Sequence, residues 1–228
     1  SYTKAGLTVN KVIADGFPFS LTIGIYASLV VVFAGILFGS VCALRQNKLI
    51  DRFFMVLSTL GSTIPSFVLA TGFLFLFSKT LGLVPAFGVD EVAGYIGPVL
   101  VIGAFPLSFI TRLTRTSLVE VQQQDYIRTA RSKGISEFKV IYKHALRNAL
   151  LPVVTYIGPM VASIVTGSFV IETVFGIPGV GQLFTDSIVN RDYPLIMGIT
   201  VFFAVLLVLA VLIVDLVYVL IDPRIKLD

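Results

Sequence analysis

Five long stretches without a charged side chain constrain this chain more than any other feature. They occupy residues 16–44, 53–78, 92–111, 148–171 and 193–214. Each has roughly the 20 residues that an α-helix needs to cross the hydrocarbon core of a bilayer. Backbone groups in lipid must satisfy their own hydrogen bonds, and the stretches lack the alternation of barrel strands. The sequence therefore predicts an all-α, polytopic membrane bundle with five transmembrane helices, and residues 1–228 form a single transmembrane domain.

The composition supports a membrane protein and argues against an enzyme. Mean hydropathy is +0.96 and only 13% of residues are charged, whereas soluble domains have about a quarter. The sequence has no metal-ligand cluster, no catalytic Ser, His and Asp set, and no phosphate-binding glycine loop followed by Lys. We therefore predict a non-catalytic subunit that binds no cofactor, no metal and no nucleic acid.

The distribution of charge predicts the orientation in the membrane. Residues 112–147 hold eight Lys or Arg and three Asp or Glu side chains, a net charge of +5, while the whole chain is +4. Basic short loops face the cytoplasm, so 112–147 and the basic residues between Arg45 and Arg52 are predicted to be cytoplasmic. By parity the N-terminus of this chain lies outside and the C-terminus inside.

The pattern within the basic loop predicts two short helices under the membrane. Gly134 favours a left-handed turn that ends the first helix, and Ser136 is placed to cap the second. Phe138, with Ile141, Tyr142, Ala145 and Leu146, gives the second helix an apolar face. Such a helix lies on lipid headgroups or docks in a groove of a partner, and the pattern leaves both readings open.

Several motifs are similar to those of a known family. Residues 125–134 and 143–152 resemble the EAA loop of binding-protein-dependent ABC importer permeases. The chain also resembles the dipeptide, oligopeptide and nickel branch of that family, at residues 167–182, 190–194, 215–218 and 222–224. Together the motifs cover the chain from about residue 15 onward, so residues 112–149 are identified as an EAA-type coupling loop by resemblance.

The resemblance assigns candidate coupling residues. The Glu-Ala-Ala positions are occupied by Arg128, Thr129 and Ala130, and Gly134 is the family glycine. The usual Ile-x-Leu-Pro segment is replaced by residues 144–147, with the proline delayed to Pro152, as is typical of the peptide branch. The residues implied to contact an ATPase are Arg128, Thr129, Ala130, Gly134, Phe138, His144 and Leu146.

The resemblance also implies the assembly in which this chain acts. It implies a permease subunit that forms half of a peptide pathway in the bacterial or archaeal cell membrane. The implied partners are a homologous second permease, cytoplasmic ABC ATPase subunits and an extracytoplasmic solute-binding protein. ATP and Mg would be used by the ATPase alone. Family members carry a further transmembrane helix, so a sixth is expected upstream. Nickel or another small solute remains an alternative cargo, and homo- or heterodimeric pairing stays open.

Two sets of residues are candidates for the pathway. The hydroxyl-rich, proline-containing pore candidates are Ser62, Thr63, Pro65, Ser66, Thr166 and Ser168, although small residues equally suit ordinary helix packing. The candidates for an external gate or a binding-protein contact are Glu172, Phe175 and Pro178; alternatively, Glu172 marks the membrane boundary. An ion-coupled secondary transporter is the rival class, but the apolar runs lack the charged residues and histidines that it usually needs.

Overall fold

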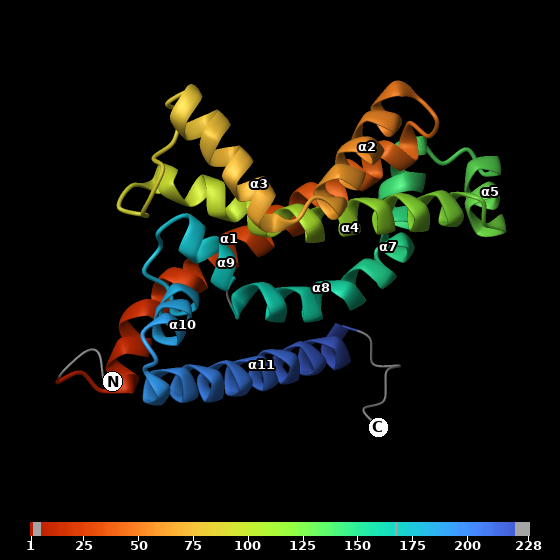
Figure 1. The fold of residues 1–228 in the computed structure, drawn as a ribbon. Helices are drawn as coiled ribbons and strands as arrows, with labels where there is room; N and C mark the ends of the chain where they lie inside the picture. Colours follow the sequence, from red (N-terminus) through yellow and green to blue (C-terminus); the bar gives the residue numbers. More distant parts are fainter. Residues whose placement is uncertain (2–5, 167, 222–228) are drawn as a thin grey trace. The chain divides into compact units, whose positions relative to one another are not determined.

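The computed structural model describes residues 1, 6–166 and 168–221, with the backbone alone at 215 and 217–221. Every regular element in these residues is a helix, as predicted (Figure 1). Long helices are α1 (Val9–Leu44), α4 (Ile96–Gln122) and α11 (Tyr193–Ile221). The others are α2 (Leu49–Thr63), α3 (Ser66–Phe73), α5 (Asp125–Ser132), α6 (Glu137–Lys139), α7 (Leu146–Ala149), α8 (Leu151–Val165), α9 (Phe169–Val174) and α10 (Val180–Val189).

Three short segments depart from α-helical geometry. Leu74–Thr80 (η1) and Val140–Ala145 (η3) are π-helical, and Val92–Tyr95 (η2) is a 3₁₀ turn that leads into α4. Three helices are long and apolar enough to span a membrane, and the number rises to five if α2 with α3–η1 and α6–α7 with α8 each form one broken span. The described residues thus agree with the five predicted spans by length and composition.

Proline and glycine act differently in two of the predicted spans. The second span breaks at its proline, because α2 ends at Thr63 and α3 begins after Pro65, which has no backbone N–H to donate. In the third span, the low helix propensity of glycine and proline would favour a break as well. Instead α4 continues through Pro106, and Gly97 lies where a Cβ atom would meet the rings of Phe175 and Phe73.

The helices extend beyond the limits set by the uncharged runs. α4 continues from the predicted end at Thr111 to Gln122, so the first part of the predicted 112–149 loop is helix. The fourth uncharged run, by contrast, is divided between two helices, because α8 ends at Val165 and α9 starts at Phe169. A charged side chain marks a change in solvent, but it does not stop the backbone from remaining helical.

The chain divides into two compact units. Unit 1 comprises residues 1–29, 64–103 and 158–228, and unit 2 comprises residues 30–63 and 104–157. In unit 1, the start of α1 packs on α10 and α11 (Figure 1), through a buried cluster of Val12, Ile13, Val180, Leu195 and Ile199.

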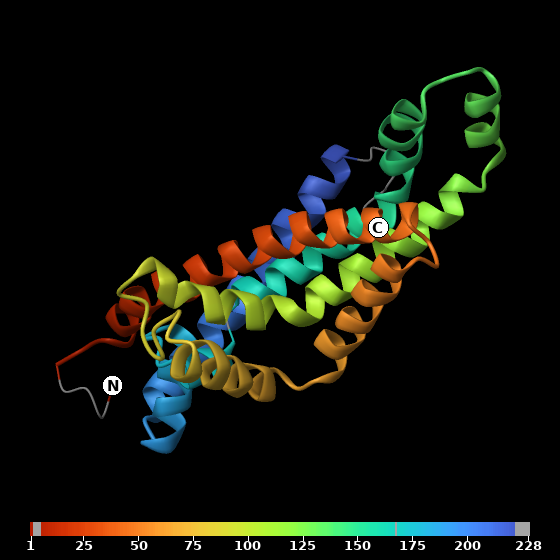
Figure 2. The ribbon, with the colours of Figure 1, turned by 90° about the horizontal axis from the view of Figure 1, so that it is seen from above.

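In unit 2, the end of α1 packs closely on α4. A Cβ atom at Gly35 would meet Ile110, and one at Gly39 would meet Thr114, so these glycines permit a close helix contact. Beyond the end of α4, the chain turns through α5 and returns along α6, η3 and α7 (Figure 2).

Candidate functional site

The turn of the coupling loop has the geometry that its sequence predicts. Gly134 has φ +75°. Its N–H donates to the carbonyl of Arg131 at 2.9 Å, and the N–H of Ile135 donates to that of Ala130 at 3.4 Å. These two bonds form a Schellman motif, which ends α5 and reverses the chain. Ser136 then occupies the cap position of α6, although its side chain makes no capping hydrogen bond.

The two arms of the loop are joined by an ion pair and a small apolar core. Arg131 donates two hydrogen bonds to Glu137 across the turn, at 3.1 and 2.7 Å. The loop also contributes to a buried cluster of Ala43, Leu118, Ile127, Ala130, Val140, Ala145 and Ala149. The loop therefore packs around a core that it shares with the ends of α1 and α4, rather than being a flexible connection.

Packing around that core buries part of the predicted docking face. Ala130 is only 8% exposed and Ala145 is fully buried, so neither side chain is exposed in this arrangement, and the predicted contact of Ala130 with an ATPase stays a prediction. Leu146 is partly buried against the same core. For the second loop helix, the physical reason is the π-helical segment η3, which changes the register between Phe138 and Leu146. The apolar face expected from a regular helix is therefore divided, with Ala145 buried in the core and Phe138 and Tyr142 exposed.

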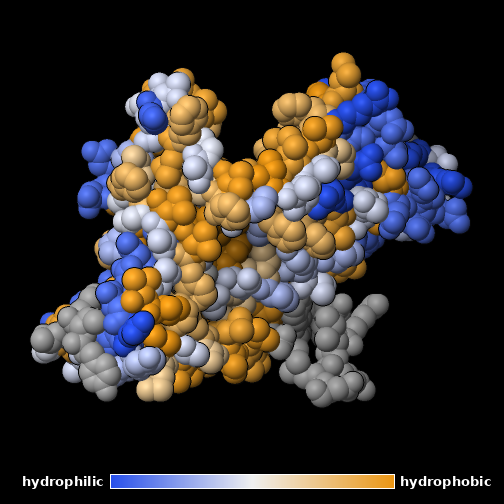
Figure 3. Space-filling view, in the orientation of Figure 1, coloured by the Kyte–Doolittle hydropathy of each residue, from blue (hydrophilic) through white to orange (hydrophobic). Residues whose placement is uncertain are grey.

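The outward side of the loop is aromatic and basic. Phe138 is 69% exposed and Tyr142 is 56% exposed, with their ring centroids 4.4 Å apart. Arg128 and Thr129 are exposed on α5, and His144 is half-buried. On the face shown in Figure 3, hydrophilic side chains gather over α5. Exposed aromatic and arginine side chains are those enriched at protein interfaces.

A buried ion pair that the sequence analysis missed joins α2 to α4. Asp51 accepts hydrogen bonds from Nε and Nη2 of Arg115 at 2.6 and 2.7 Å, and from the N–H of Asn47 at 2.8 Å. The side chain of Asp51 is 3% exposed. A lone acidic residue at the start of an apolar helix was the available signal, but it does not identify a partner 64 residues away.

The external segment is organised around another buried carboxylate. Glu172 is 1% exposed and accepts hydrogen bonds from the N–H groups of Gly181 and Gln182 at 2.7 and 3.2 Å. It thereby satisfies donors at the start of α10, where the helix dipole favours negative charge. Ser20 also hydrogen-bonds this carboxyl. Burial raises the pKa of Glu172 above its ordinary value, and these hydrogen bonds oppose the rise.

Small residues make room for that carboxylate. A Cβ atom at Gly179 or Gly181 would collide with Glu172. Phe175 is 3% exposed, and its carbonyl accepts from the N–H of Gly88 at 2.9 Å. Glu172 and Phe175 are thus buried in this arrangement, and their predicted role as an external gate or a binding-protein contact stays a prediction. Pro178 follows them in the chain, is exposed, and remains a candidate contact.

The pore candidates are polar side chains that hydrogen-bond to their own helices. The hydroxyls of Ser62 and Thr63 donate to the carbonyl of Thr59 at 3.1 and 2.7 Å, Thr166 donates to Ser163 at 2.7 Å, and Ser168 caps α9. Pro65 and Ser66 are exposed. Ser62 and Thr63 belong to unit 2 and the other four to unit 1, so their role in a pathway stays a prediction. Among the described residues, no group of three or more potential ligands could hold a metal ion.

Comparison with known families identifies the type of protein. The family described as "Binding-protein-dependent transport system inner membrane component" matches residues 35–227. The chain belongs to this family. The permease is thus a multi-pass component of the cell membrane, as its apolar helices predict.

Named relatives and a solved structure agree with this assignment. The permease is 49% identical over 227 residues to the dipeptide transport system permease protein of Bacillus subtilis (strain 168), covering 100% of this chain and 74% of the relative. It is 43% identical over 228 residues to the oligopeptide transport system permease protein of Haemophilus influenzae, covering 99% and 74%. An inward-facing MetNI methionine ABC transporter shares the fold, with a TM-score of 0.72, 16% identity, and coverage of 90% of this chain and 94% of that one.

Proposed function

We propose that this permease is the membrane subunit of an ATP-binding-cassette importer for dipeptides or oligopeptides. The observation that supports the cargo most directly is the 49% identity, across the whole chain, to a dipeptide transport permease. A second relative at 43% identity carries an oligopeptide transport name. Peptide cargo therefore has more support than nickel or another small solute, which the sequence motifs alone leave open.

The coupling loop is where the permease meets the ATPase in this proposal. A loop with a packed core and an ion pair across its turn can pass on rigid-body motion, whereas a flexible connection would absorb it. The exposed Phe138 and Tyr142, flanked by basic residues, supply the contact surface. Arg128, Thr129 and His144 border this surface, while Ala130, Gly134 and Leu146 hold its shape.

The remaining partners follow from the family and the charge distribution. The permease pairs with a homologous second permease to complete the pathway, and a solute-binding protein delivers cargo near Pro178. The basic segments 45–52 and 112–147 face the cytoplasm, which places the N-terminus of this chain outside. The predicted cytoplasmic C-terminal segment 222–228 lies outside the described residues, as does the Gly167 motif position.

The cargo is tested by uptake of a labelled dipeptide in cells whose own peptide permeases are deleted. Cells that express the whole transporter should take up the label, and excess unlabelled dipeptide or oligopeptide should compete. Excess nickel should have no effect. Competition by nickel, with none by either peptide, would replace the peptide assignment by a metal one.

A further inference from the structure

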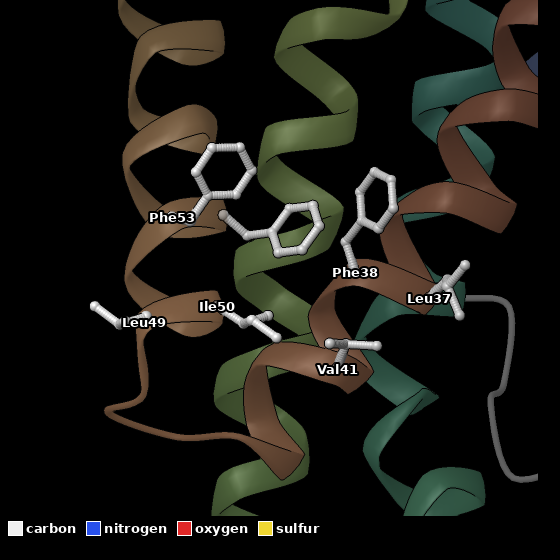
Figure 4. A pocket seen from close by; sticks show the side chains of 7 residues that line it. Leu37, Phe38, Val41, Leu49, Ile50 and Phe53 are labelled. Carbon is white, nitrogen blue, oxygen red and sulfur yellow. The ribbon is translucent and has the colours of Figure 1, made fainter.

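An apolar groove of about 460 Å³ lies between the end of α1 and the start of α2 (Figure 4). Six of its lining residues are Leu37, Phe38, Val41, Leu49, Ile50 and Phe53. The volume lies within the roughly 300–1,000 Å³ of small-molecule sites. Leu49 is 81% exposed and Phe53 is 63% exposed, so the groove opens at the surface of unit 2 and suits an apolar occupant.

Aromatic rings from both helices pack together in this groove. The rings of Phe38 and Phe54 stack with centroids 4.6 Å apart, and the ring of Phe53 meets that of Phe54 edge-on at 5.5 Å. Figure 4 shows Phe38 on α1 and Phe53 on α2, on either side of the opening. A wall of stacked rings is a shape that an extended hydrocarbon chain can lie against.

A basic pocket of about 550 Å³ adjoins the groove at the turn between the two helices. It is lined by Arg45, Asn47, Lys48, Leu49, Ile50 and Arg52, so Leu49 and Ile50 border both spaces. The two features together form an amphipathic site. Its apolar part lies along the helices, and its cationic part lies at their end.

The acidic residue of this turn does not neutralise the pocket. Asp51 is occupied by Arg115 and by the N–H of Asn47. In the part of the chain that the structure describes, Arg45, Lys48 and Arg52 are exposed and form no ion pair. Arg52 also lies within electrostatic reach of Asp51, but Arg115 already balances that carboxylate. The three cations therefore leave an excess of positive charge beside the apolar groove.

We propose that this site binds an anionic phospholipid, with one acyl chain in the groove and the phosphate in the basic pocket. Guanidinium groups bind phosphate with paired, charge-assisted hydrogen bonds. Basic pockets at the cytoplasmic ends of transmembrane helices attract anionic headgroups. A transmembrane protein segment in the groove would leave the three cations unneutralised, so the charge favours the lipid.

The test uses the intact transporter in vesicles that contain equal amounts of phosphatidylglycerol and phosphatidylcholine. In parallel samples, one lipid or the other carries a photoactivatable diazirine on its acyl chain, and crosslinked peptides are quantified by mass spectrometry. Peptides from residues 37–54 report on the groove. Peptides from α11 are the internal control, because Val201 and Val208 are 62% and 66% exposed within an uncharged stretch of sequence.

The crosslinking ratio of phosphatidylglycerol to phosphatidylcholine should be at least about fivefold higher at the groove than on α11, since one cation near an anionic headgroup contributes roughly this factor. Arg45→Gln/Lys48→Gln/Arg52→Gln should lower the groove ratio to that of α11. Lys133→Gln/Lys139→Gln/Lys143→Gln removes the same charge from the coupling loop and should leave it unchanged. Equal ratios in the wild type would overturn the proposal in favour of ordinary surrounding lipid. Crosslinks on α11 with none at the groove would show that a protein segment covers it.

Discussion

At the residue scale, the carboxylate of Glu172 holds the external segment to the start of α10. Two of its backbone donors, Gly181 and Gln182, lie nine and ten positions further along the chain. Gly176, with φ +60°, lets the chain turn between the carboxylate and these donors. One side chain thereby fixes the loop that presents Pro178.

The raised pKa of Glu172 predicts a particular pH dependence of stability. The folded state holds the proton of the Glu172 carboxyl more tightly than the unfolded state does. At pH values between the ordinary and the raised pKa, the folded state therefore binds more protons than the unfolded state. Its contribution to stability is therefore greatest below the ordinary pKa and falls as pH rises through the raised value, by about 1.4 kcal/mol per pKa unit. Glu172→Gln removes this dependence.

The measurement is the Tm of the purified transporter, wild type and Glu172→Gln, from about pH 5 to 8. The Tm of the variant relative to wild type should rise with pH. Asp186→Asn is the control for the loss of a carboxylate at the surface, because Asp186 is exposed on α10. A constant difference for Glu172→Gln would show that this carboxyl titrates normally.

At the scale of elements, the Asp51–Arg115 pair fixes the start of α2 to α4. Arg115→Ala would leave Asp51 buried and without its cation, which costs about 3–5 kcal/mol in comparable sites. Arg128→Ala is the matched control, because its pair with Asp125 is exposed and 3.6 Å apart and such pairs contribute about 0–1 kcal/mol. Thermal unfolding should show a much larger loss for Arg115→Ala. Equal losses would mean that the pair has no structural role.

The turn between α5 and α6 gives a prediction about coupling. Pro at 134 fixes φ near about −65°, which is incompatible with the observed φ of +75°, so α6 would be re-aimed. Gly134→Asn should be tolerated, because Asn adopts left-handed conformations and a Cβ atom there meets nothing within 4 Å.

ATPase co-purification and peptide uptake, at matched membrane abundance, are the measurements for these variants. Gly134→Pro should reduce both by more than roughly tenfold if the turn positions an interface hot spot. Gly134→Asn and the exposed-surface variant Lys143→Ala should stay near wild type. Normal ATPase retention and uptake in Gly134→Pro would exclude the loop as the coupling element.

Local backbone chemistry explains which of these elements could be predicted from sequence. The break before Pro65 and the turn at Gly134 depend on the residue at that position, and the predicted turn is confirmed. The Asp51–Arg115 pair and the buried place of Ala130 depend on packing between distant segments. The π-helical segment η3 has no recognisable pattern in the sequence, and it divides the expected apolar face of the second loop helix.

At the scale of the whole molecule, the charge distribution predicts which loops an impermeant reagent can reach. Cysteines at Glu91 and Ser132, both exposed, are introduced singly in a Cys42→Ala background, since Cys42 is the only native cysteine. In intact cells Glu91→Cys should react with an impermeant maleimide, and Ser132→Cys should react only after permeabilisation. The reverse labelling pattern would invert the proposed topology.

The central claim, that this permease carries peptides with energy from a separate ATPase, is tested most directly in proteoliposomes. The complete transporter and its binding protein are reconstituted, and uptake of a labelled dipeptide is measured with ATP, with a non-hydrolysable ATP analogue, or with an imposed proton or sodium gradient. The account predicts uptake only with hydrolysable ATP, and none from liposomes that lack the ATPase. Uptake driven by an ion gradient in the absence of ATP would contradict it and favour a secondary transporter.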